Sequence, residues 1–394
     1  MTLSENEPNQ RLRPPGQDLE RIICTGPLHT MLLASLRQQN TPNSNTPIRI
    51  LSTFIIALIL LYLYKSMSSA PKPPIPAPPT QNFHYEYTVH KGLFLQSEDD
   101  TDDASFDFRK HNFGLVDRLY PTDGSTDEEG REQWRRFERY IRSLNESVGK
   151  EEGRSVKVLL LGRHGQGWHN VAETKYGTRA WDCHYAALNG SDGLTWSDAH
   201  LTPLGHQQAL DVHTLWSTQL PHGLPPPDTH YLSPLTRAIQ TADLTFSHLP
   251  LPPHKPYTPL VKELLREALG IHTCDRRSTR SHLATTHPHL TFEPAFTEQD
   301  ELWDPQYREP RGARRYRVAM LLDDVWEHDG GVWISMTAHS GAIASLLESL
   351  GHRAFALETG GVIPVVVEGR RVEGARRVPE REPSDEPDCE GWEG

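Results

Sequence analysis

The sequence predicts an α/β fold of three layers, in which helices cover both faces of a mostly parallel sheet. Short apolar runs that are typical of buried strands occur at 156–161, 229–233, 332–337 and 362–367. Segments with helical spacing lie between these runs. Such alternation indicates a parallel or mixed sheet with helices packed on both of its faces.

The helices are marked by their starts and their apolar spacing. Thr202 is expected as an N-cap with Pro203 in the first helical position. An amphipathic packing helix is expected at 127–144, because its apolar residues recur at helical spacing. Further helices are expected at 235–246 and 341–350.

A polar tripeptide follows the first predicted strand. Gly162 ends the apolar run, and Arg163, His164 and Gly165 come directly after it. Ligands of open α/β sheets bind in the crevice at the carboxyl ends of the strands. A histidine beside an arginine at that point can be a nucleophile beside an anion clamp.

The charge balance limits the classes of partner. The 394 residues carry a formal net charge of −12, which argues against nucleic acid as the main partner. A site for an anionic substrate therefore has to be a local cluster of arginines. The 21 histidines are scattered, and proline separates the nearest pair, His287 and His289, so we expect no metal centre.

The four cysteines are far apart in the sequence, at Cys24, Cys183, Cys274 and Cys389. They suggest neither a disulfide framework nor a metal site, and so favour a reducing compartment and a cytoplasmic location of the globular domain. Two N-glycosylation sequons begin at Asn145 and Asn189, and they matter only if the domain faces a secretory lumen.

Composition divides the chain into five parts. These are a disordered region at 1–47, a candidate transmembrane anchor at 48–65, a proline-rich linker at 66–82, a globular domain at 83–369 and a disordered charged tail at 370–394. As a helix, the apolar stretch 48–64 would span roughly 25 Å, slightly less than a bilayer core. Alternatively, the chain starts at Met67 and this stretch lies upstream. The oligomeric state stays open.

Five segments together resemble the histidine phosphatase superfamily, the phosphoglycerate mutase-like proteins. Arg163-His164-Gly165, with Asn170 after it, resembles the signature of this family, and the others match in the usual order: 201–205 (LTPLG), 233–242 (SPLTRAIQTA), 266–270 (REALG) and 337–341 (TAHSG). The segments 112–115 and 273–278 resemble a eukaryotic, mostly fungal phosphatase-like branch. The resemblance implies the phosphoglycerate mutase-like fold and an enzyme that needs no metal or cofactor.

The resemblance also implies a role for each matching residue. His164 would be the nucleophile, Arg163 and Arg237 would hold the phosphate, and His339 would donate to it. Glu267 would be the proton donor, although Glu263 lies one helical turn earlier and stays an alternative. Ser340 would contact the substrate, and Asn170 would either hydrogen-bond the phosphate or fix the imidazole. Arg276, Arg277 and Arg280 would either bind the rest of an anionic substrate or be ordinary surface charges.

Departures from the mutases favour hydrolysis. Their box reads RHGxSxWN, whereas this chain has Gly167 and His169 at the serine and tryptophan positions, and the substrate-binding segments of the mutases are not recognisable. We therefore expect a metal-independent phosphatase that hydrolyses a small phosphomonoester through a phosphohistidine. The alternatives are a phosphoglycerate mutase-type isomerase and a non-catalytic binding protein on the same fold.

Overall fold

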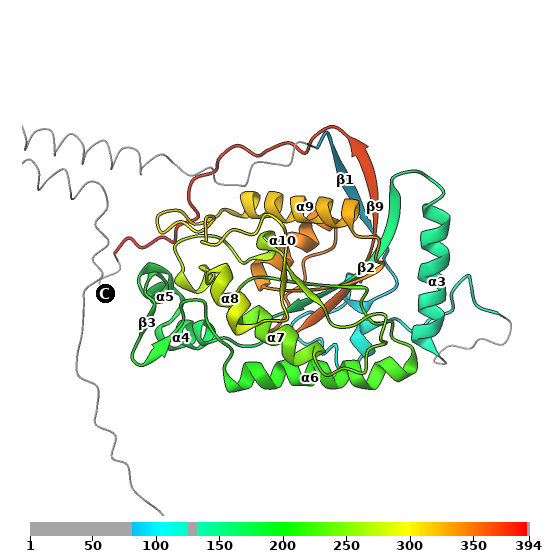
Figure 1. Ribbon diagram of the computed structural model, residues 1–394, viewed down its shortest axis with the longest axis horizontal. Helices are drawn as coiled ribbons and strands as arrows, with labels where there is room; N and C mark the ends of the chain where they lie inside the picture. Colours follow the sequence, from blue (N-terminus) through cyan, green and yellow to red (C-terminus); the bar gives the residue numbers. More distant parts are fainter. Residues whose placement is uncertain (1–80, 125–131, 392–394) are drawn as a thin grey trace, which may run out of the picture. The chain divides into compact units, whose positions relative to one another are not determined.

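The computed structural model describes residues 81–124 and 132–391 (Figure 1). The expected disordered region at 1–47, the candidate anchor at 48–65 and all but the last two residues of the linker lie outside these ranges. Within the described ranges, no helix combines the length and the apolar character needed to cross a membrane.

The predicted sheet is confirmed as a mixed, mostly parallel sheet of seven strands in the order β1-β9-β2-β8-β5-β6-β7. Its strands are β1 (Phe83–Val89), β2 (Arg154–Arg163), β5 (Thr229–Leu232), β6 (Pro259–Val261), β7 (Thr291–Phe292), β8 (Trp333–Ala338) and β9 (Val362–Glu373). The run from β2 through β8, β5 and β6 to β7 is parallel, whereas β9 is antiparallel to both β2 and β1.

Helices cover both faces of the sheet, as predicted (Figure 1). Alternate residues of β2 separate the two cores: Val158 and Leu160 pack with one set of helices, Leu159 and Leu161 with the other. The first set is α3 (Gln133–Val148), α6 (Pro203–Gln219) and α7 (Thr236–Phe246). The second set is α9 (Arg311–His328) and α10 (Ser340–Leu350). Between β6 and β7 lies the short helix α8 (Arg280–Thr286).

The start of α6 fixes the loop that carries the histidine box. Thr202 caps the helix by accepting a hydrogen bond from the Gly205 N–H at 3.1 Å, and Pro203 is the first helical residue, as expected. A Cβ on Gly205 would lie 2.1 Å from the carbonyl oxygen of Gln166. Only glycine allows this approach, so the LTPLG turn presses α6 against the loop after β2.

A smaller unit at 168–199, which we call the α4–β4 segment, has its own apolar cluster. It comprises α4 (Trp168–Tyr176), α5 (Thr178–Cys183), the turn Tyr185–Ala187, β3 (Gly190–Ser191) and β4 (Leu194–Thr195). Trp181 and Trp196 are buried at its centre, with ring centroids 5.4 Å apart, and Cys274 packs against them.

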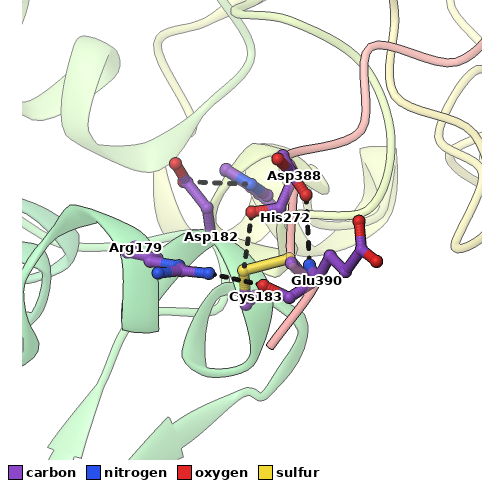
Figure 2. Close-up of a disulfide and its surroundings, with 7 residues drawn as sticks. Arg179, Asp182, Cys183, His272, Asp388 and Glu390 are labelled. Carbon is purple, nitrogen blue, oxygen red and sulfur yellow. Dashed lines mark hydrogen bonds and ion pairs between the residues drawn. A yellow bond between two sulfur atoms is a disulfide. The ribbon is translucent and has the colours of Figure 1, made fainter. Parts of the chain in front are cut away.

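The C-terminal part differs from the expected disordered tail. Strand β9 continues to Glu373, and Arg376 then pairs with the buried Asp323 at 2.7 Å. Farther on, the Asp385 N–H donates to the carbonyl of Arg308, and Cys389 forms a disulfide with Cys183 (Figure 2). The prediction that the cysteines form no disulfide was wrong, because the partners are 206 residues apart and spacing gives no sign of their contact. Its corollary, a reducing compartment, loses that support.

Candidate functional site

A cavity of about 290 Å³ opens at the carboxyl ends of β2 and β5 and at the start of α10. Six of the predicted site residues line it: Arg163, His164, Asn170, Arg237, Glu267 and Ser340. They come from segments up to 177 positions apart, since Arg163 ends β2 and Ser340 begins α10. The topology therefore brings most of the predicted residues to the edge where ligands of such sheets bind.

His164 is oriented by its own loop. Its Nδ1 lies 2.7 Å from the carbonyl oxygen of Gly165, which can only accept, so Nδ1 carries the proton. Nε2 is then an unprotonated acceptor, and it faces Nε of Arg237 at 3.3 Å. Burial, followed by the charge of Arg237, lowers the pKa of His164 well below its ordinary value. The imidazole is therefore neutral, with its lone pair directed at a guanidinium.

The side of Arg237 that faces away from His164 is held by hydrogen bonds to Cys274 and Asp275. Arg237 lies in the first turn of α7 and is buried, and its two terminal nitrogens donate to the carbonyl of Cys274 at 2.6 Å and to Asp275 at 2.8 Å. Asp275 also binds Arg308 at 2.9 Å. Burial opposes the ionisation of Asp275, but Arg308 and Arg237 outweigh it and hold the pKa of this carboxyl well below its usual range.

Arg163 and His339 each keep an unused polar atom. Arg163 donates to the carbonyl of Leu357 at 2.7 Å, while its Nε is buried without a partner in the described ranges. His339 is fully buried directly before α10, and its ring centroid lies 5.0 Å from that of His164. Its Nε2 lies 2.7 Å from Ser233 Oγ, while its Nδ1 has no partner in the described ranges. Burial, then Arg237, lowers the pKa of His339 well below normal, so it is neutral as well.

The geometry separates the two candidate acids. Glu267 lies on the cavity wall. Its carboxylate accepts the N–H of Gly341, at the N-terminus of α10, at 2.8 Å and the N–H of Ala268 at 2.9 Å. Glu263 instead pairs with Arg266 and Arg277, both at 2.8 Å, away from the cavity. Of the two, only Glu267 can reach a ligand in the cavity.

Asn170 closes the loop after the histidine. Its Oδ1 accepts the Gly167 N–H at 3.0 Å and so fixes the start of α4. The side chain lines the cavity from that position, as the family box implied.

The three arginines that were considered as substrate-binding residues or as surface charges do not line the cavity. Arg277 is buried in its ion pair with Glu263. Arg276 donates to Asn189 Oδ1 at 3.2 Å and lies over a tryptophan ring, and Arg280 lies over Phe292 at the start of α8. Closeness to Glu267 in the sequence was misleading, because the turn Thr273–Asp275 sends Asp275 inward and the chain then leaves the site.

Several cavity residues were missed: His169, His272, Asp275, Arg308 and Arg314. His169 could have been found, because it occupies the tryptophan position of the family box, and its Nδ1 is buried without a partner in the described ranges. No sequence motif identifies Arg308 or Arg314 as a site residue. Donor atoms of His272, Cys274 and Asp275 lie within 4.8 Å of one another, but the ion pairs of Asp275 with two guanidiniums make this cluster unsuitable for a cation.

Comparison with known proteins finds a matching family and similar fungal proteins. The family described as histidine phosphatase superfamily (branch 1) matches residues 190–359. A "Probable phosphoglycerate mutase" of Arthroderma benhamiae is 48% identical over 75% of this chain and 87% of its own length. "Phosphomutase-like protein 3" of Candida albicans is 42% identical over 54% of this chain and 65% of its own.

Among solved structures, a phosphoglycerate mutase from Bacillus anthracis aligns with a TM-score of 0.35 at 20% identity, over 54% of this chain and 89% of that one.

We predict that Arg237→Gln raises the pKa of His164 toward its ordinary value, because it removes the nearest positive charge, while Asp275 keeps its ion pair with Arg308. NMR titration of histidine-labelled protein, with the signal assigned from His164→Gln, measures this. Arg276→Gln is the matched control and should leave the titration unchanged, since this guanidinium lies outside the cavity. An unchanged His164 titration in Arg237→Gln would mean that the two groups are not electrostatically coupled.

Proposed function

Because the chain belongs to the histidine phosphatase superfamily, we propose that this phosphoryl-transfer enzyme is a metal-independent phosphatase that hydrolyses a small phosphomonoester through a phosphohistidine. The observation that carries the proposal is the geometry of His164, whose Nδ1 lies against the Gly165 carbonyl and whose Nε2 faces Arg237. A neutral imidazole in this arrangement can attack a phosphorus atom that the arginines hold in place.

In the first step, His164 Nε2 forms a bond to phosphorus while the ester P–O bond breaks in line with it. Arg163 and Arg237 hold the equatorial oxygens, whose charge they balance. His339 donates a further hydrogen bond to the phosphoryl group. Glu267 gives its proton to the leaving oxygen, so the alcohol departs neutral.

In the second step, water attacks the phosphohistidine. Glu267, now ionised, takes a proton from the water as the new P–O bond forms and the P–N bond breaks. Inorganic phosphate leaves, and His164 returns to its neutral form with Nδ1 protonated. Each residue thus ends the cycle in its starting state.

A phosphoglycerate mutase-type reaction is the second candidate, and the name of the 48% identical fungal relative favours it. In that reaction the phosphohistidine would have to be protected from water and returned to a bound phosphoglycerate. Hydrolysis is the better proposal, because Gly167 and His169 replace the serine and tryptophan of the mutase box. A non-catalytic binding role is a third possibility, which the intact set of arginines and histidines argues against.

Phosphate release from an aryl phosphate tests the proposal. We expect turnover by the full chain that a chelator does not reduce and that His164→Ala abolishes. Conversion of 3-phosphoglycerate with a bisphosphate primer, faster than phosphate release from either compound, would instead establish the mutase. Failure of both reactions would leave the binding role.

The assignment of the acid is tested by leaving-group dependence. Glu267→Gln keeps the shape of the side chain but removes the transferable proton, so we expect turnover of an alkyl phosphate to fall ~10²–10⁴-fold. An aryl phosphate with a good leaving group should be affected much less. Glu263→Gln is the matched control: it should lower stability, because it weakens two buried arginine pairs, and keep the ratio of the two rates. A selective loss of alkyl phosphate turnover in Glu263→Gln would reverse the assignment.

A further inference from the structure

We propose that this domain matures in an oxidising compartment and carries an N-linked oligosaccharide on Asn189. Two independent features of the α4–β4 segment support this: a disulfide at the end of α5, and an exposed sequon at the start of the β3–β4 hairpin. Neither feature depends on the proposed reaction.

The disulfide joins Cys183 to Cys389 across a separation of 206 residues, with their Cα atoms 5.6 Å apart. The tail is also held there without the disulfide, since Arg179 donates to the carbonyl of Glu390 at 2.7 Å (Figure 2). The bond forms when the two thiols pass two electrons and two protons to the disulfide of an oxidoreductase. Structural disulfides of this kind persist in oxidising compartments and are rare in the cytosol.

The remaining cysteine of the described ranges does not compete for this bond. Cys274 is buried in the apolar cluster of the α4–β4 segment, and burial raises the pKa of its thiol well above the usual value. Thiol–disulfide exchange needs an accessible thiolate, so the buried Cys274 does not react. Among the cysteines of the described ranges, Cys183 and Cys389 therefore pair only with each other.

Asn189 is presented as a glycan acceptor. It begins the sequence Asn189-Gly190-Ser191, its side chain is exposed, and it precedes a tight hairpin turned by Asp192 and Gly193, both with positive φ. The carbonyl of Asn189 accepts two backbone N–H groups, and its Oδ1 accepts from Arg276 at 3.2 Å. These bonds orient the side chain but leave Nδ2 without a partner in the described ranges.

The second sequon is a natural contrast. Asn145 lies within α3, and its Oδ1 accepts the backbone N–H of Val156 at 2.8 Å, at the start of β2. A glycan on this side chain would have to fit between the helix and the sheet. The folded domain therefore accommodates a glycan on Asn189 and not on Asn145.

Glycosylation of Asn189 consumes an oligosaccharide carried on a lipid diphosphate. A bond forms between Asn189 Nδ2 and C1 of the first sugar, the bond from C1 to phosphate breaks, and the lipid diphosphate leaves as the amide loses one proton. The modified hairpin is anchored by Trp196, which packs on Trp181 in the cavity wall. The disulfide and the glycan thus sit on one unit beside the site.

The test uses the full chain, with its own N-terminal region, expressed in a eukaryotic cell and treated with peptide N-glycosidase. We expect a gain in electrophoretic mobility on treatment. Asn189→Gln and Ser191→Ala should each abolish this gain, while Asn145→Gln, the matched control, should keep it. Alkylation without reductant should leave Cys183 and Cys389 unlabelled.

An unglycosylated chain with both cysteines alkylated would overturn the proposal. A glycan that persists in both Asn189→Gln and Ser191→Ala would also overturn it, since it would then lie elsewhere.

Discussion

Asp275 holds the two halves of the site together. One carboxylate oxygen binds Arg237, whose Nε faces His164, and the other binds Arg308. Arg308 also donates to the carbonyls of Ala268 and Gly270, which directly follow Glu267 in the chain. A single buried carboxylate thus sets Arg237 and the segment that carries Glu267 relative to each other. Loss of one partner from such a network is costly, because it leaves a buried charge without compensation.

Burial and the neighbouring arginine keep the histidines neutral. His164, His169 and His339 are close together, and burial, followed by the charge of Arg237, lowers the pKa of each one. An imidazolium in this group would be repelled by the arginines and by its neighbours. The free site therefore concentrates positive charge on guanidiniums, while it keeps imidazole lone pairs available. Such an arrangement suits a phosphate dianion that is attacked by nitrogen.

Short stretches of sequence predicted the strands and helix starts that depend on neighbouring residues alone. The apolar runs gave β2, β5, β8 and β9, and Thr202-Pro203 gave the start of α6. The strands β6 and β7, the last two at one end of the sheet, were missed, because they have three and two residues. Asp275 and Arg308 were missed for another reason: their roles arise from contacts over 33 and more positions. The buried ion pair of Arg277 was not foreseen, because its partner, Glu263, was considered only as a rival acid. The tail follows the same rule, since its charge suggested disorder until Asp323 and Cys183 were placed beside it.

The central claim is that His164 becomes covalently phosphorylated. Labelled substrate, mixed rapidly with the full chain and quenched without acid, should give an acid-labile, alkali-stable phosphohistidine that maps to His164. His164→Ala should abolish labelling and turnover together. His339→Ala should slow the reaction by roughly 10²–10³-fold, as expected for one lost transition-state donor, and still give some label. Label on His339, or full activity in His164→Ala, would contradict the account.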